Sequence, residues 1–291
     1  MRQSLVKGPI QMLFSAFCFA VMAYFAKLAS ATIPGSEVVF FRFLLGVIVA
    51  IILAAFGRVD LKATRRDLLI ARGVFGGSAI ILYFMAIAGG SLTNSTVLNN
   101  TYPIFATLIA VLALKEKVPS STWFSLIIAW VGVGFLIHPD FQQLFWPDLL
   151  GLASGVISGF AIVIVRELRK NGEPAWTVFF YLSLFGLVAS FFFAIPEWVW
   201  PNPLAWWYLF ATAVLGLVAQ VTMTSAYKYC SASSGSILSM TTMVFAAFFG
   251  MVGLGETLTG PEALGALLIG VGGGLVAWLG NQDRDQKIKD K

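Results

Sequence analysis

Polar side chains that suit the binding of a small solute follow one face of the segment 93–114. Five residues fall within about 100° of one another on a helix of 3.6 residues per turn: Thr96, Asn99, Asn100, Pro103 and Thr107. Two adjacent Asn amides in an apolar segment need hydrogen-bond partners, because unpaired polar groups in hydrocarbon are costly. This face is a candidate site for the carboxylate, amine or hydroxyl groups of a solute, with interhelical packing as the alternative. Pro103 adds a kink and a free backbone acceptor near Asn99.

Similar polar residues recur in three other segments of the chain. They are Tyr83 in 67–88, Gln220 and Tyr227 in 204–228, and Ser236 and Ser239 in 233–254. Together with the Asn pair, they predict a cavity lined by amide and hydroxyl groups that would suit an amphipathic organic solute. Buried structural hydrogen bonds, and close packing through the small residues, are the alternatives.

Arg42 is a charged residue inside the apolar segment 36–56, about two helical turns from its first end. Ionisable residues within membrane spans are costly and usually face the interior of the bundle or water. We therefore consider Arg42 a candidate for binding an anion or carboxylate in the outer half of the cavity. Snorkelling to the lipid headgroups is the alternative, and Glu37, one to two turns earlier, could pair with it.

The composition of the chain indicates that these side chains lie on membrane-embedded elements. Of the 291 residues 58% are hydrophobic and 11% are charged, whereas soluble domains carry about 25% charged residues. Most of the chain must therefore lie in lipid, which leaves no room for a soluble catalytic or nucleotide-binding domain. The sequence has one His, no CxxC pair and no P-loop motif. We accordingly expect no enzyme, no metal and no cofactor.

The apolar runs predict an all-α membrane protein with ten transmembrane helices, since one span needs roughly 20 apolar residues. Pro, Gly and charged residues bound the runs. The predicted spans are 9–29, 36–56, 67–88, 93–114, 121–138, 147–168, 175–195, 204–228, 233–254 and 261–280.

Charge predicts how these spans are oriented, because Lys and Arg are enriched in cytoplasmic loops. With the N-terminus in the cytoplasm, 17 of the 19 Lys and Arg residues fall on the inner side, among them the cluster Arg58, Lys62, Arg65, Arg66 and Arg72. Both termini are therefore predicted to be cytoplasmic. Lys27, near the outer end of its span, is expected to be an interfacial anchor.

The two halves of the chain resemble each other. A shift of 140 residues aligns Glu116 with Glu256, and a shift of 139 aligns Lys27 with Arg166. The one-residue change in the shift is what a small loop deletion produces. In the segment 147–168, Gly151, Gly155 and Gly159 form two overlapping GxxxG motifs, which predict close helix contact within the bundle or, less readily, dimerisation.

The repeat predicts three parts: a five-helix unit over 1–140, a second over 141–280, and a polar cytoplasmic tail over 281–291. Five is an odd number, so the second unit should be inserted upside down relative to the first. Inverted repeats are the usual architecture of secondary transporters, with the solute site near the midplane between the halves.

The chain resembles the EamA-type branch of the drug/metabolite transporter superfamily over essentially its whole length. The matching motifs are Phe41-Arg42-Phe43-Leu44-Leu45, Tyr102-Pro103-Ile104-Phe105-Ala106, Leu114-Lys115-Glu116-Lys117 and Gly253-Leu254-Gly255-Glu256-Thr257-Leu258. One departure is that Met243 stands opposite Pro103. The resemblance implies a bundle whose fifth and tenth spans lie outside the central cavity. It also implies transport of small metabolites, often export of amino acids or related compounds, across a bacterial inner membrane.

These observations predict a multi-pass secondary transporter of the cell inner membrane. Its partners would be a small-molecule solute and the lipid bilayer, without nucleic acid, and it would act as a monomer or weak homodimer. A membrane channel or a non-transporting scaffold is the alternative, although no continuous ring of charged or polar residues can be assembled. An intramembrane enzyme is less favoured, because the sequence has no nucleophile–base pair or ligand set within its spans.

Overall fold

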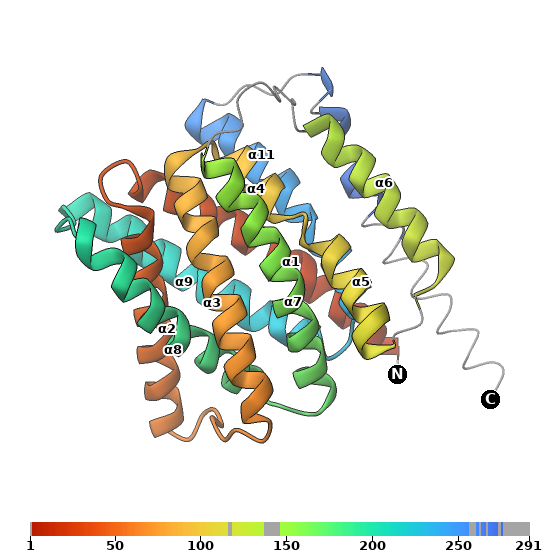
Figure 1. The fold of residues 1–291 in the computed structure, drawn as a ribbon, viewed down its shortest axis with the longest axis horizontal. Helices are drawn as coiled ribbons and strands as arrows, with labels where there is room; N and C mark the ends of the chain where they lie inside the picture. Colours follow the sequence, from red (N-terminus) through yellow and green to blue (C-terminus); the bar gives the residue numbers. More distant parts are fainter. Residues whose placement is uncertain are drawn as a thin grey trace.

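The computed structural model describes residues 2–115, 118–136 and 146–255, together with 260–261, 263–265, 267–272 and 275. Within these residues the secondary structure is helical (Figure 1). The helices of the first half are α1 (Arg2–Ala29), α2 (Gly35–Ala55), α3 (Arg66–Gly89), α4 (Leu92–Asn99), α5 (Tyr102–Leu114) and α6 (Ser120–Leu136). Those of the second half are α7 (Trp146–Lys170), α8 (Ala175–Ala194), the 3₁₀ turn η1 (Ile195–Glu197), α9 (Pro203–Ala226), α10 (Ala232–Ser239) and α11 (Thr241–Leu254).

Eight helical segments are long and apolar enough to cross a membrane, with α4 and α5 forming one of them and α10 and α11 another. All eight begin and end within two residues of their predicted bounds. The predicted fifth span corresponds to α6, an apolar helix of 17 residues. The predicted tenth span, the polar tail and both Glu116 and Glu256 fall largely or wholly outside the described residues, so the predicted total of ten is not confirmed.

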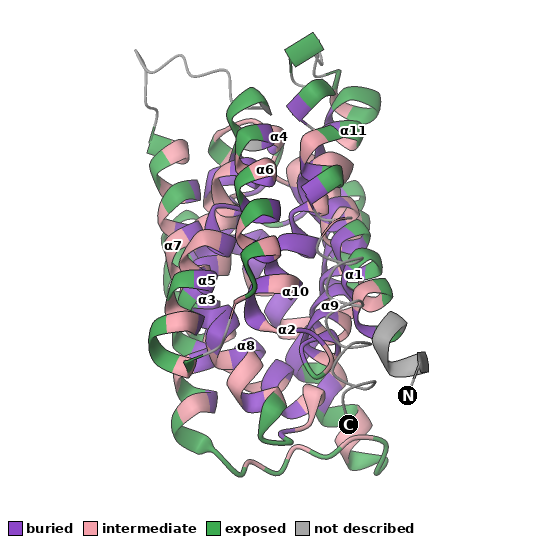
Figure 2. Cartoon of the chain, turned by 90° about the vertical axis from the view of Figure 1, so that its right-hand side faces the viewer, coloured by how far each residue is buried: buried purple, intermediate pink, exposed green. Residues whose placement is uncertain are grey.

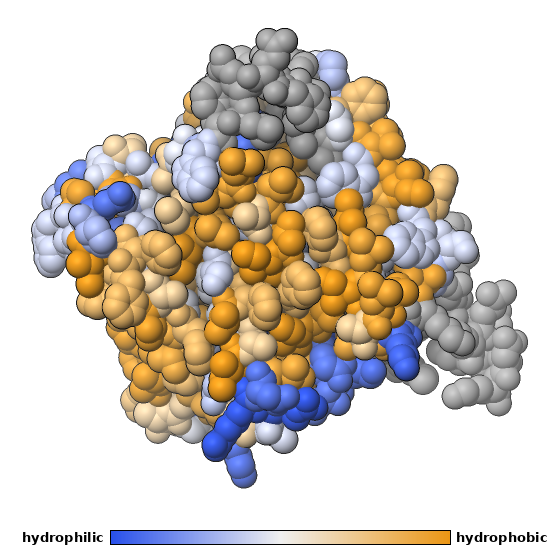
Figure 3. Space-filling model, in the orientation of Figure 1, coloured by the Kyte–Doolittle hydropathy of each residue, from blue (hydrophilic) through white to orange (hydrophobic). Residues whose placement is uncertain are grey.

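The outer surface of the bundle is apolar, as contact with lipid requires. Large apolar side chains are exposed along the helices, for example Leu112 at 79% and Phe56 at 77%. Figure 3 shows apolar side chains covering most of one face, with hydrophilic residues gathered toward its edges. Buried residues instead occupy the inward faces of the helices, as Figure 2 shows around α10. An exposed apolar surface of this extent marks a membrane-embedded protein.

Two of the predicted spans are broken in the middle. The first break lies beside the kink that Pro103 predicts, whereas the second corrects the expectation of a continuous helix. In the first half the break separates α4 from α5 at Asn100 and Thr101, and Pro103 lies in the first turn of α5. In the second half α10 ends before Met240, with no proline nearby.

Side chains that bond to their own backbone explain both breaks, because such bonds compete with helical hydrogen bonds. The Asn100 amide donates to the Thr96 carbonyl at 2.8 Å. The hydroxyls of Ser239 and Thr241 donate to carbonyls three residues earlier, at 2.7 and 2.8 Å.

The two halves pack against each other in a repeated pattern. Helix α1 packs on α9 as α7 packs on α3, and α1 packs on α11 as α7 packs on α5. The hydroxyl of Ser15 in α1 donates to the Ala219 carbonyl of α9 at 2.7 Å. The hydroxyl of Ser154 in α7 donates to the Ala79 carbonyl of α3, also at 2.7 Å. These two bonds are related by the shifts of 139 and 140 residues seen in the sequence.

The basic pair aligned by the repeat has equivalent contacts as well. Lys27 donates to the carbonyls of Ile87 at 3.0 Å and Gly90 at 2.5 Å, at the end of α3. Arg166 donates to the Tyr227 carbonyl at 2.8 Å, at the end of α9. Cations in this position favourably meet the negative end of a helix dipole. Lys27 therefore stabilises the end of a neighbouring helix, rather than only anchoring the chain at the lipid interface.

The glycine face of α7 makes the close contacts that its GxxxG motifs predict. A Cβ added at Gly155 would lie 2.7 Å from the Leu98 carbonyl oxygen, at the end of α4. A Cβ added at Gly159 would lie 3.1 Å from the backbone nitrogen of Ala106 in α5. Only residues without side chains allow α7 to come this near to the broken helix.

Candidate solute cavity

A cavity of about 100 Å³ lies inside the bundle, between the two halves. Its walls come from α1 to α5, α7 and α9 to α11. Among the described helices, α6 and α8 contribute no lining residue. The position of α6 at the edge of the bundle (Figure 1) agrees with a fifth span outside the cavity.

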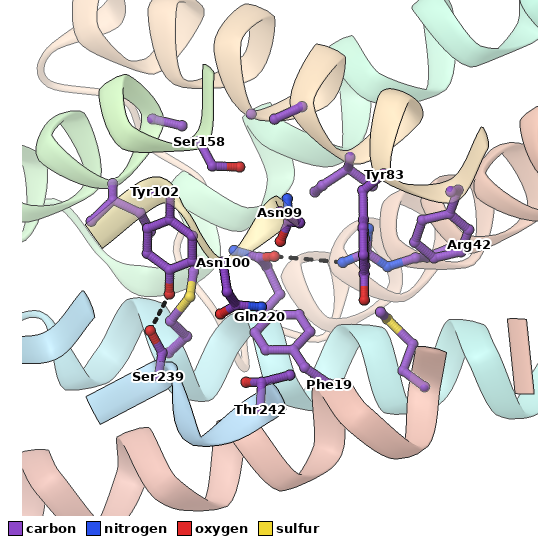
Figure 4. Close-up of a pocket in the computed structure, with 18 of the residues that line it drawn as sticks. Phe19, Arg42, Tyr83, Asn99, Asn100, Tyr102, Ser158, Gln220, Ser239 and Thr242 are labelled. Atoms are coloured by element: carbon purple, nitrogen blue, oxygen red, sulfur yellow. Dashed lines mark hydrogen bonds between the residues drawn. The ribbon is translucent and has the colours of Figure 1, made fainter. Parts of the chain in front are cut away.

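Six of the ten residues predicted to bind a solute line this cavity. They are Arg42, Tyr83, Asn99, Asn100, Gln220 and Ser239. They come from five helices and the break after α4, so they converge only in the fold. Figure 4 shows Arg42 and Tyr83 at one end, Tyr102 and Ser239 at the other, and Asn100 and Gln220 between them.

The other four predicted residues lie behind the cavity wall, outside its lining. The Thr96 hydroxyl shares a hydrogen bond of 2.8 Å with Tyr83 Oη, so it positions that ring. Ser236 donates to the Ser233 carbonyl at 2.9 Å. Pro103 is buried in the first turn of α5, and Tyr227 is fully buried at the end of α9.

The broken helix explains why one predicted face separates in this way. The expected stripe assumes a single helical phase from residue 96 to residue 107. The break at Asn100 and Thr101 resets that phase. Asn99, Asn100 and Tyr102 consequently line the cavity, although a continuous helix would place Tyr102 elsewhere.

Arg42 lies inside the bundle and does not reach out to the headgroups. Its side chain is buried, with the guanidinium carbon 5.3 Å from the Phe43 ring centre and 5.6 Å from that of Phe84. Nη2 donates to Gln220 Oε1 over 3.5 Å. Glu37 does not pair with it, since positions five residues apart lie about 140° apart around a helix. The Glu37 carboxylate instead accepts from the Val199 backbone N–H at 3.0 Å.

Arg72, expected at the inner membrane surface with its basic neighbours, instead lines the cavity. It is 3% exposed and makes no hydrogen bond or ion pair with the described residues. A signal for this was present in the sequence. Arg72 precedes Tyr83 by 11 residues, about three helical turns, which places both on one face of α3.

Hydrogen bonds fix several of the lining groups. The Asn99 amide donates to Ser154 Oγ at 2.6 Å, and that hydroxyl in turn donates to the Ala79 carbonyl. The hydroxyls of Tyr102 and Ser239 are hydrogen bonded across the two halves. A solute here would meet preorganised amide and hydroxyl groups on several sides.

The cavity is built from equivalent positions of both halves. Six pairs of lining residues are related by the shifts of 139 or 140: Phe19 and Ser158, Met22 and Ala161, Ile80 and Gln220, Tyr83 and Met223, Asn99 and Ser239, Tyr102 and Thr242. Three of the six pairs join a polar residue to an apolar one. Both halves thus line the space, the first with more residues than the second, and its chemistry is not symmetric.

The chemistry available to the cavity is that of binding. Its lining contains two arginines and no carboxylate. Among the described residues no group of three His, Cys, Asp or Glu side chains could hold a metal ion.

Comparison with known proteins finds similar proteins over most of the chain. The sequence matches the EamA-like transporter family over residues 6–137 and again over residues 145–278. A pseudopaline exporter of Pseudomonas aeruginosa is 30% identical over 266 residues, which cover 89% of this chain and 91% of the exporter. A riboflavin transporter of Vibrio cholerae is 26% identical over 240 residues, covering 78% of each chain. A solved crystal structure has a TM-score of 0.75 at 18% identity, covers 97% of this chain and 99% of that chain, and supports the fold alone.

Proposed function

The chain belongs to the EamA-like transporter family, and on that premise we propose that it is a secondary transporter working by alternating access. It moves a small organic solute across a bacterial inner membrane. The observation that carries this proposal is the buried cavity, which equivalent residues of both halves line together. Solute sites of secondary transporters commonly lie between two structural repeats.

The finer parts of the proposal follow from the sequence pattern and the relatives. The units 1–140 and 141–280 are inverted relative to each other, and both termini are cytoplasmic. Export of an amino acid or related compound is the favoured direction, and the similarity to a pseudopaline exporter supports it. The riboflavin transporter among the relatives indicates that cargo differs between family members. The transporting unit is a monomer or a weak homodimer.

Counterflow in proteoliposomes tests the proposed function. Vesicles carrying the purified chain are loaded with an unlabelled solute, and uptake of the labelled solute is followed without ATP. A carrier gives saturable uptake that the internal solute stimulates. The binding site returns to the outer side carrying unlabelled solute, and it can then bind labelled solute again. A channel gives uptake that internal solute does not stimulate. Absence of counterflow across a panel of amino acids, organic acids and nucleosides would refute the proposal.

Ser154→Ala should slow transport more than its equivalent, Ser15→Ala. Ser154 Oγ accepts from the Asn99 amide, so its loss frees a cavity group as well as removing a helix contact. Ser15 makes only the helix contact, to Ala219. Each change should cost about 1 kcal/mol in stability. We expect counterflow to fall roughly five- to tenfold in Ser154→Ala and to stay near wild type in Ser15→Ala; equal rates in the two variants would argue against a role for Asn99.

A further inference from the structure

We infer that the transported solute is an organic dianion, such as a dicarboxylate, whose two anionic groups bind separately at Arg42 and Arg72. This inference rests on the proposed function and narrows its substrate class, from amino acids and related organic solutes to solutes with two anionic groups. It starts from the charge of the cavity. The two arginines are the only charged residues among the described residues that line it, and neither forms an ion pair with a carboxylate of the described chain.

Arg42 has hydrogen-bonding capacity that the protein does not use. It is 5% exposed. One long hydrogen bond, to Gln220, engages Nη2, while Nε and Nη1 are buried without a partner. The rings of Phe43 and Phe84 hold the guanidinium group in place. A carboxylate can accept two parallel N–H bonds from such a planar group.

Arg72 leaves even more capacity open. It is 3% exposed, its Nε is buried without a partner, and it makes no hydrogen bond or ion pair within the described chain. The two arginines also repel each other through space. Two like charges held without counter-charges in a membrane-embedded bundle are costly, so an anion from outside the chain is needed to balance each of them.

Each guanidinium group lies against a glycine, and these two glycines are equivalent positions of the repeat. A Cβ added at Gly216 of α9 would collide with Arg42 Nε, and one added at Gly76 of α3 would collide with Arg72 Nη1. Gly76 and Gly216 are related by the shift of 140 residues. Both arginines come from the first half, from α2 and α3, yet Arg42 lies against the glycine of the second half and Arg72 against that of the first. One solute lying between the two halves can therefore reach both.

The rest of the lining fits the body of such a solute. Asn99, Asn100 and Tyr83 offer amide and hydroxyl groups, whereas Met22 and Phe19 offer apolar contact. A zwitterionic amino acid would bring an ammonium group for which the cavity has no carboxylate. The charges of a dianion match both arginines and leave no group unpaired.

Counterflow with a graded set of solutes tests this inference. Reconstituted full-length protein is tested with labelled dicarboxylates from malonate to adipate, with the monoamide of each, and with zwitterionic alanine and leucine. We expect at least one dicarboxylate to exchange, and its monoamide to exchange roughly 10- to 100-fold more slowly, because one charge-assisted contact is lost.

Charge-removing variants test whether the two arginines cause that preference. In Arg42→Gln and in Arg72→Gln we expect dicarboxylate exchange to fall roughly 10- to 100-fold and the preference over the monoamide to disappear. Arg66→Gln removes the same charge from an exposed position of the same helix, so it should retain wild-type exchange and preference. Arg72→Lys keeps the charge and should retain the preference even if its rate falls. It also serves as the test if a glutamine variant does not fold.

The outcomes separate this inference from the transport proposal. Exchange of amino acids without exchange of any dicarboxylate would overturn the dianion inference and leave transport standing. A preference for the diacid that survives in both Arg42→Gln and Arg72→Gln would likewise overturn it. If none of these solutes exchanges, the dianion inference fails, and the transport proposal fails with it only when the wider panel of amino acids, organic acids and nucleosides also gives no counterflow.

Discussion

Gly155→Leu should prevent the protein from folding into its native bundle. A Cβ at this position would lie 2.7 Å from the Leu98 carbonyl oxygen and 2.9 Å from that of Asn99, and it would also clash with Thr101 Oγ1. Backbone atoms cannot rotate away as a flexible side chain can. Overpacking of a tight core costs about 1–3 kcal/mol and occasionally more, and here the whole contact between α7 and the broken helix would have to open.

Yield and thermal unfolding of detergent-extracted protein measure this effect. We expect little or no monodisperse Gly155→Leu protein, and a clearly lowered melting temperature for Gly155→Ala. Gly134→Leu is the matched control, because Gly134 is also a helical glycine but an added Cβ there meets nothing within 4 Å. It should extract and melt as the wild type does. A normal melting temperature for Gly155→Leu would mean that α7 does not lie against α4 as described.

The spans could be predicted from the sequence because membrane burial imposes a simple rule of length and hydropathy. That rule is local, and each of the eight described spans obeys it. The helix breaks follow a different rule. Pro103 signalled the first of them, but the second, at Met240, depends on hydroxyl groups that bond to neighbouring carbonyls. A Ser or Thr hydroxyl can form such a bond in a continuous helix or at a break, so the residue type alone does not predict a break.

Cavity residues could be predicted from the sequence only where a polar side chain stands in an otherwise apolar span. Asn99, Asn100 and Gln220 stood out because amides are rare in apolar helices. Arg72 did not stand out, since it follows basic residues near a predicted membrane surface and resembles them in type. Its spacing from Tyr83 indicates the face of α3 on which it lies, but only the packing of α3 on α7 and α8 buries it. The depth of a charge near the end of a span is a tertiary property.

The loops at two ends of the bundle are each held by one buried glutamate of the opposite half. Glu37, at the start of α2, accepts from the Val199 N–H in the segment between α8 and α9. Glu173, just before α8, accepts from the N–H groups of Thr64 and Arg65 in the segment between α2 and α3, at 2.7 and 2.6 Å. Both glutamates are almost fully buried. These hydrogen bonds link the first unit to the second through residues that are far apart in the sequence.

Glu173→Ala should destabilise the protein by about 3 kcal/mol, because it removes two charge-assisted hydrogen bonds that a buried carboxylate accepts at the start of α3. The matched control is Asp67→Ala at the same helix end. The Asp67 side chain is 65% exposed in its ion pair with Arg65, so its loss should cost less than about 1 kcal/mol. Glu173→Gln keeps one acceptor oxygen, so its loss of stability should fall between those of the two alanine variants.

Thermal unfolding measures the order of stability of these variants, and trypsin cleavage after Lys62 measures release of the loop. Cleavage should be fast in Glu173→Ala and near wild type in Asp67→Ala; equal stability of the two alanine variants would show that the buried carboxylate does not join the halves.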